Sequence, residues 1–232
     1  MFVLFLEQEK CAPVVDVAFL VDSSGSIRFR DYRKMKTFVS KMVEKFNISP
    51  AGSRVAVVQY STRATTVIRF GVYTNSQAFE RAVQGLRHER GYTRIDLALI
   101  RAYYDLFRAR VNTRFLVPKI AFVLTDGEQT KRFSFTPLDE ASQLLKDVGV
   151  LVIAIGIGKS VKREELEQIA SSKKEVIIAK SFDDLLPAVE SLTQTACEDI
   201  EGKSQPQQAV CVLYKLITVN TEMLRKHSRE AC

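Results

Sequence analysis

Two kinds of segment alternate along the chain, distinguished by the spacing of their apolar residues. Nearly continuous apolar runs rich in Val and Ile are typical of strands that are covered on both faces. They lie at 14–21, 53–60, 65–70, 118–128 (where the strand runs into a turn), 150–158 and 175–179. Apolar residues spaced three or four apart are typical of helices, and this spacing is found at 29–46, 76–86, 93–107, 138–149, 162–170 and 181–196.

The alternation of strands and helices predicts a doubly wound α/β fold, with a mostly parallel sheet and helices on both faces. The segment 65–70 follows 53–60 after a short turn, so we expect it to form one antiparallel edge strand beside its predecessor. Ser76 and Ser181 are the expected N-caps of their helices, and Gly149 is expected to end another.

The same pattern divides the chain into three parts. Residues 14–196 form the predicted domain, and residues 1–13 are an N-terminal extension. From Cys197 the sequence becomes polar and linker-like, so 197–232 is interpreted as a cysteine-containing tail or the start of a further module. No apolar stretch approaches the length of a transmembrane helix. The first residues lack the basic region and the apolar length of a signal peptide, so no secretion signal is visible in this chain.

Charge changes the list of expected partners. The chain has 34 Lys and Arg against 27 Asp and Glu among 232 residues, a net charge of +7. A basic surface favours acidic proteins and anionic glycans as partners. Aromatic residues do not alternate with basic ones as a single-strand binder requires, so nucleic acid is not an expected partner. His88 and His227 are isolated and are expected at the surface.

The four cysteines bear on the cellular compartment. Cys11 and Cys197 lie just outside the two ends of the predicted domain, and Cys211 and Cys232 both lie in the tail. Of the three pairings that four cysteines allow, 11–197 and 211–232 are favoured, which suits an oxidising compartment. The alternative is four unpaired thiols in a cytosolic protein. No CxxC pair is present, so a zinc site of cysteines is not expected.

Three predicted loops place oxygen-bearing side chains at the ends of strands or the start of a helix. After the first strand, the stretch DSSGS puts Asp22, Ser24 and Ser26 on alternate positions of a tight turn. Thr93 begins a predicted helix, and Asp126 follows another apolar strand. In open α/β sheets such loops meet at the carboxyl ends of the strands. Small, hard cations prefer oxygen ligands and leave some positions to water, so these five residues form a candidate metal site.

The five positions resemble the metal-ion-dependent adhesion site of von Willebrand factor type A domains. The resemblance extends over roughly residues 14–196, and its motifs are Asp22-x-Ser24-x-Ser26, Thr93 in a glycine-led loop, and Thr125-Asp126-Gly127. One departure is Tyr92, because many members of the family have two glycines before the threonine.

The resemblance implies Mg²⁺ as the bound ion, with Mn²⁺ or Ca²⁺ as alternatives. It implies that Ser24, Ser26 and Thr93 hold the ion, that Asp22 and Asp126 lie nearby or act through water, and that an open position takes a carboxylate of a partner protein. The flanking cysteines make the chain similar to the matrix branch of the family, matrilins and type VI collagen. The expected protein is therefore a secreted adhesion module of the extracellular matrix. Its expected partners are matrix or cell-surface proteins, collagen-like ones included.

Three alternatives compete with this interpretation. The chain could be an intracellular scaffold with free cysteines, or a structural assembly domain whose metal site is not used. A haloacid-dehalogenase-type phosphatase also begins with a strand ending in Asp, but it needs a second acid where this chain has Ser24. We therefore expect no enzymatic activity.

Overall fold

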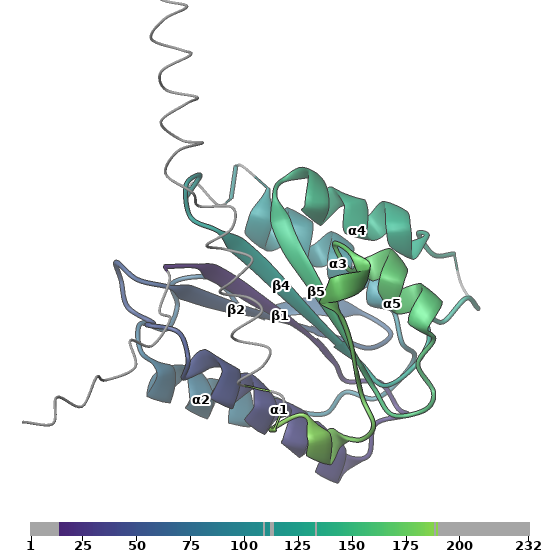
Figure 1. Cartoon of the computed structure of the whole chain (residues 1–232). Helices are drawn as coiled ribbons and strands as arrows, with labels where there is room; N and C mark the ends of the chain where they lie inside the picture. The colour runs from purple at the N-terminus through teal and green to yellow at the C-terminus, as the bar shows by residue number, and fades with distance from the viewer. Residues whose placement is uncertain (1–13, 109, 112–113, 133, 188, 190–232) are drawn as a thin grey trace, which may run out of the picture. The chain divides into compact units, whose positions relative to one another are not determined.

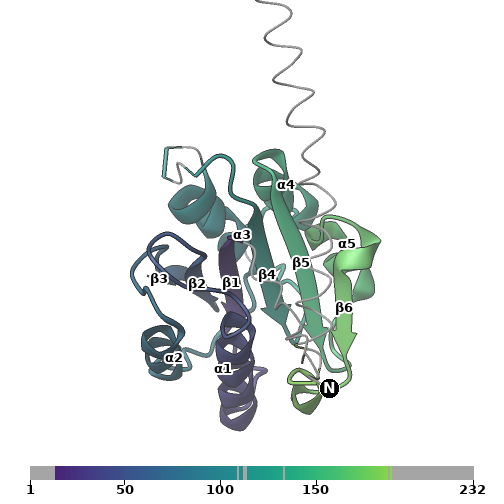
Figure 2. The same ribbon diagram turned by 60° about the vertical axis from the view of Figure 1, so that its left-hand side comes forward.

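The computed structural model describes residues 14–108, 110–111, 114–132, 134–187 and 189. Within them, six strands form one sheet in the order β3-β2-β1-β4-β5-β6, which can be followed across Figure 2. The strands are β1 (Asp16–Asp22), β2 (Arg54–Tyr60), β3 (Ala64–Ile68), β4 (Lys119–Thr125), β5 (Val150–Ile157) and β6 (Val176–Ala179). The β3 strand pairs antiparallel with β2 at the edge, and the other pairings are parallel. The predicted fold class and its antiparallel edge strand are confirmed.

Helices cover both faces of the sheet (Figure 1). Helices α1 (Phe29–Val43) and α2 (Ser76–Gln84) lie together on one face, and α3 (Ile95–Ala102), α4 (Leu138–Asp147) and α5 (Arg163–Ile169) lie on the other. Shorter turns complete the described part: a π-helical turn η1 (Tyr103–Phe107) continuing α3, and 3₁₀ turns η2 (Lys173–Glu175) and η3 (Phe182–Asp184).

An apolar layer covers each face of the sheet, so the central strands are buried on both faces. Ala18 and Leu20 of β1 belong to the layer that packs against α3, α4 and α5. Phe19 points to the opposite face, where its ring stacks on that of Phe122 with centroids 5.3 Å apart. All seven residues of β1 are buried, including the aspartates at its two ends. This is why the run reads as continuously apolar between two acids.

The helix ends differ in detail from the expectations. The predicted N-cap Ser76 is wrong: Asn75 is extended and its side chain accepts a hydrogen bond from the Ala78 backbone N–H at 2.8 Å. Ser181 does cap a turn, accepting from the Asp183 N–H at 3.3 Å, but that turn is 3₁₀. Helix α4 ends two residues before Gly149, as expected.

Some predictions fall outside the described residues. These are the four cysteines with their pairing, the extension 1–13, the tail 197–232 and most of the predicted closing helix after residue 187. The three-part division of the chain stays a prediction. No helix in the described ranges combines the length and the apolar character that crossing a bilayer requires.

Candidate metal centre

The carboxyl ends of β1 and β4 lie side by side, because these two strands pair in the middle of the sheet. The loops that follow them are tied to the loop before α3. Gly25 N–H donates to Gly91 O at 2.9 Å, and Thr130 N–H donates to Thr93 O at 2.8 Å. The strand order changes direction at this point of the sheet, which is where ligand sites form in doubly wound folds.

Three of the predicted ligands form a continuous chain of hydrogen bonds. The hydroxyl oxygens of Ser24 and Ser26 lie 2.9 Å apart. The Ser26 hydroxyl donates to Asp126 Oδ1 at 2.7 Å, although the two residues are a hundred positions apart in the sequence. Two loops therefore present hydroxyl and carboxylate oxygens to the same point.

Asp22 lies next to these hydrogen-bonded residues, at the end of β1, and is completely buried. Its Oδ1 accepts from the Ser24 backbone N–H at 2.8 Å, and its Oδ2 accepts from the Thr125 hydroxyl at 2.9 Å. Burial raises the pKa of Asp22 to about 7, and the negative charge of Asp126 acts in the same direction. The pKa of Asp126 is also raised, chiefly by burial. The site therefore holds two carboxyl groups whose charge the surrounding residues do not compensate.

Thr93, the fifth predicted ligand, reaches the site from the loop before α3. Its side chain is nearly buried, and Thr93 Oγ1 lies 3.9 Å from the position a Cβ would take on Gly127. The Thr93 backbone N–H donates to the Thr130 hydroxyl at 3.1 Å. The structure thus brings all five predicted residues to one end of the sheet, four by mutual hydrogen bonds and Thr93 by its approach to Gly127.

The chemistry of these donors fits a small, hard cation. Among the described residues, no group of three His, Cys, Asp or Glu side chains could hold a metal ion. The site instead combines neutral hydroxyls with two carboxyls of raised pKa, and a divalent ion would offset their charge. Ser24, Ser26 and Thr93 could hold such an ion directly, and Asp22 and Asp126 could do so directly or through water.

The residues that support the loop were not found by sequence reasoning. Ser23 Oγ accepts from the Gln59 side-chain amide at 3.1 Å and from the Glu89 N–H at 2.8 Å. His88, expected to be an isolated surface histidine, is half-buried, and its Nε2 lies 2.9 Å from Ser24 O. The His88 ring stacks on Tyr32 with centroids 4.8 Å apart. The expectation for His88 is therefore wrong, and no local pattern marked these long-range contacts.

The loop before α3 has a shape that depends on glycine. Gly91 has φ +103°, and a Cβ placed on it would meet the hydroxyl oxygen of Thr62. That hydroxyl accepts from the Tyr92 N–H at 3.1 Å. At the base of the loop, Arg94 and Asp96 form a nearly buried bidentate pair at 2.9 and 2.8 Å. These contacts fix the position of Thr93 between them.

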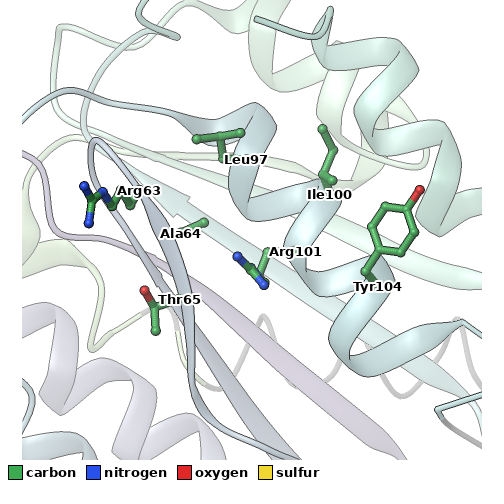
Figure 3. A pocket seen from close by; sticks show the side chains of 7 residues that line it. All are labelled: Arg63, Ala64, Thr65, Leu97, Ile100, Arg101 and Tyr104. Atoms are coloured by element: carbon green, nitrogen blue, oxygen red, sulfur yellow. The ribbon is translucent and has the colours of Figure 1, made fainter.

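A hollow of about 510 Å³ lies elsewhere on the domain, between the edge strand β3 and helix α3 (Figure 3). It is lined by Arg63, Ala64, Thr65, Leu97, Ile100, Arg101 and Tyr104. None of the five candidate ligands lines it, so it does not form part of the candidate metal centre.

The sheet order, the helical layers and the loop cluster define a doubly wound domain with a polar site at the carboxyl ends of its strands. The family model of the von Willebrand factor type A domain matches residues 16–194. The chain therefore belongs to the von Willebrand factor type A family.

Its relatives include proteins of the extracellular matrix. The chain is 32% identical to cuticlin-6 of Caenorhabditis elegans, over 79% of this chain and 31% of that protein. It is 32% identical to the mouse collagen alpha-4(VI) chain over 89% of this chain and 8% of that protein. It is 30% identical to mouse matrilin-4 over 80% of this chain and 30% of that protein. The chain thus spans less than a third of the length of these relatives.

Solved structures give the same assignment. Proximal thread matrix protein 1 from the mussel byssus is 30% identical, with a TM-score of 0.74 over 81% of this chain and 48% of that chain. Another structure of that protein, described as having a zinc-occupied MIDAS motif, is 32% identical with a TM-score of 0.74, over 81% of this chain and 47% of that chain. Metal binding is therefore on record for a relative of this fold.

Proposed function

We propose that this chain is a secreted adhesion module of the extracellular matrix that binds an acidic residue of a partner protein through Mg²⁺. The observation that carries the proposal is the convergence of Ser24, Ser26, Thr93 and two carboxyl groups of raised pKa at the carboxyl ends of β1 and β4. The matrix relatives and the zinc-occupied motif of the mussel protein support it.

The residues of the site have separate roles in this proposal. The three hydroxyls would hold the ion without neutralising it, and Asp126 would fix the hydroxyl of Ser26 in place. Asp22 would hold the turn through the Ser24 N–H. When bound, Mg²⁺ would supply an open coordination position with uncompensated positive charge, which attracts a carboxylate.

The proposal assigns no enzymatic activity to the site. The position where a phosphatase of the haloacid-dehalogenase type would carry its second acid holds Ser24, whose hydroxyl lies in the hydrogen-bonded chain with Ser26. Mn²⁺ or Ca²⁺ could replace Mg²⁺ with the same oxygen ligands. A collagen-like protein is one class of partner, and the basic surface would add affinity for acidic proteins or anionic glycans.

Thermal unfolding in Mg²⁺ and in EDTA tests the metal site. A ligand that binds only the folded state stabilises it by about 2.7 kcal/mol at a hundredfold excess over its Kd, which raises Tm by roughly 5–10 °C for a domain of this size. We expect this rise for the wild type and its loss in Asp126→Ala. Glu140→Ala, which removes an exposed acid on α4, should keep it. The absence of any rise in the wild type at millimolar Mg²⁺ would refute the proposed function.

The secreted location has its own test. Mass spectrometry of the native protein after alkylation counts its free thiols. We expect no free thiols and two disulfides. Four alkylated cysteines would instead support the intracellular scaffold.

A further inference from the structure

Tyr92, the residue that departs from the pattern of the family, holds an arginine from another loop. Arg132 Nη1 donates a hydrogen bond to the Tyr92 hydroxyl at 3.1 Å. The guanidinium carbon lies 5.9 Å from the centroid of the Tyr92 ring. Tyr92 is 39% exposed, so the pair lies at the surface. The ring and its hydroxyl together restrict where the guanidinium can lie.

The charge of Arg132 is not neutralised by any described residue. Its loop neighbour Lys131 pairs with Glu165 at 3.2 Å, and Arg94 pairs with Asp96 at 2.8 Å. Arg132 is exposed and has no ion pair within the described ranges. A guanidinium has five N–H donors in a planar fork suited to a carboxylate. The bond to Tyr92 uses one of them.

The Arg132–Tyr92 pair lies beside the candidate metal centre. Tyr92 directly precedes Thr93, and consecutive Cα atoms are about 3.8 Å apart. An extended peptide spans about 3.3–3.6 Å per residue. The loop of Arg132 is also tied to Thr93, because Thr130 and Thr93 exchange hydrogen bonds at 2.8 and 3.1 Å. We therefore expect a peptide with one carboxylate at the metal centre to reach the guanidinium a few residues along.

Other charges at this edge of the sheet favour an acidic partner. Arg28 and Arg90 are exposed in the loops that carry Ser26 and Thr93, and neither has an ion pair among the described residues. Of the acids near these loops, Asp31 lies 3.6 Å from Lys34, and Glu89 accepts a hydrogen bond from Ser61 at 3.3 Å. The Ser61 hydroxyl is neutral, so Glu89 keeps its charge. With a divalent ion at the centre offsetting Asp22 and Asp126, Arg28, Arg90 and Arg132 outnumber Glu89, and the remaining charge at this edge is mostly positive, which attracts acidic sequences and disfavours basic ones.

We propose that the partner segment carries two acidic residues a few positions apart. The first binds at the metal centre, and the second binds the Arg132 guanidinium, which Tyr92 holds in place. The inference rests on the proposed function, because the first acid is the one that binds at the metal centre. It adds a residue pair that selects among acidic partners. Restricting the guanidinium beforehand reduces the conformational entropy lost on binding.

Synthetic peptides of glycine and serine test this selection. One peptide carries a single glutamate, and the others carry a second glutamate two, three or four positions away. Their affinities for the wild-type chain are measured by fluorescence anisotropy at low salt, in Mg²⁺ and in EDTA. We expect the best-spaced second glutamate to strengthen Mg²⁺-dependent binding by about three- to tenfold.

Variants distinguish the contribution of the Arg132–Tyr92 pair to binding from that of the basic surface as a whole. Arg132→Gln should remove the gain from the second glutamate and leave the affinity for the single-glutamate peptide unchanged. Tyr92→Phe, which keeps the ring but loses the hydroxyl, should reduce the gain. Arg81→Gln removes the same charge from an exposed position on α2 and should keep the full gain.

The outcomes distinguish the two proposals. A gain that persists in Arg132→Gln, or falls equally in Arg81→Gln, overturns the inference and leaves the metal centre intact. If the second glutamate strengthens binding to Tyr92→Phe as much as to the wild type, the Tyr92 hydroxyl does not hold Arg132 for the partner. Failure of the single-glutamate peptide to bind wild type in Mg²⁺ overturns both proposals. Binding of a heparin oligosaccharide in EDTA that Arg132→Gln abolishes, without any peptide gain, overturns the inference by assigning the pair to a sulfated glycan.

Discussion

Strand β1 begins and ends with a buried aspartate, and the two ends are neutralised differently. Asp16 accepts from Arg54 at 2.9 and 2.6 Å and from Arg114 at 3.0 Å. Asp22 accepts from the Ser24 backbone N–H and the Thr125 hydroxyl and has no cationic partner among the described residues, and a second carboxyl, that of Asp126, lies close enough to raise its pKa. Both aspartates are 0% exposed.

The difference separates the structural end of the sheet from the end that carries the proposed metal site. At the amino end, the fold supplies two arginines for the acid that it buries. At the carboxyl end it supplies only neutral donors to Asp22 among the described residues, and in the proposed function an ion from solution supplies the missing positive charge. Buried charges that lack a counter-charge are expected mainly at functional sites. The predictions below test the contrast between the two ends of β1.

The largest expected effect is at the amino end. Asp16→Asn leaves Arg54 and Arg114 facing a neutral amide, and breaking a buried ion pair costs about 3 kcal/mol. We expect urea unfolding to show that loss equally in Mg²⁺ and EDTA. A loss of stability that Mg²⁺ restores would mean that the two ends are not independent.

A smaller loss is expected in the loop that carries Thr93. Gly91→Ala combines positive φ with a contact between the new Cβ and Thr62, whereas Gly71 has φ +80° and open space around its missing Cβ. Positive φ alone costs about 1 kcal/mol, so we expect about 1 kcal/mol for Gly71→Ala and about 2 kcal/mol for Gly91→Ala.

The two glycine variants also differ in what they do to the site. Gly91→Ala should weaken the stabilisation by Mg²⁺, because Tyr92 and Thr93 shift with the loop. Gly71→Ala should leave it unchanged. Equal losses of stability and equal Mg²⁺ responses in both variants would show that the contact with Thr62 does not position Thr93.

The smallest effect is expected at Asp22, and it has the opposite sign to that at Asp16. Asp22→Asn removes a buried charge that lacks a counter-charge, and the Thr125 hydroxyl can turn to Gly127 O, which lies 3.1 Å away. We expect the free energy of unfolding in EDTA to rise by up to about 1 kcal/mol. The stabilisation by Mg²⁺ should be lost. A variant destabilised in EDTA as much as Asp16→Asn would erase the contrast between the two ends.

The strands and the clustering of the candidate residues were predictable from the sequence for the same physical reason. Continuous apolar runs identify strands buried on both faces, and the polar residues that end those runs then fall at the carboxyl edge. This logic placed Asp22 and Asp126 beside each other without any contact information. It fixed the antiparallel edge strand as well, because the connection between β2 and β3 is too short for a crossover.

The remainder depends on contacts between residues far apart in the sequence. Arg114 reaches Asp16 across 98 positions, and Arg132 reaches Tyr92 across 40. Arginines look alike in sequence whatever they contact in the fold, so nothing marked either of them. The N-cap at Asn75 in place of Ser76 is a local error of one residue, because both residue types cap helices well.

The central claim is that Ser24, Ser26, Thr93 and the two aspartates hold one divalent ion. Mn²⁺ is its most direct probe, since electron paramagnetic resonance distinguishes free from bound ion. We predict one bound Mn²⁺ per chain, displaced by Mg²⁺, and none at that site in Asp126→Ala. Equal Mn²⁺ binding by wild type and Asp126→Ala, or no binding by either, would contradict the account.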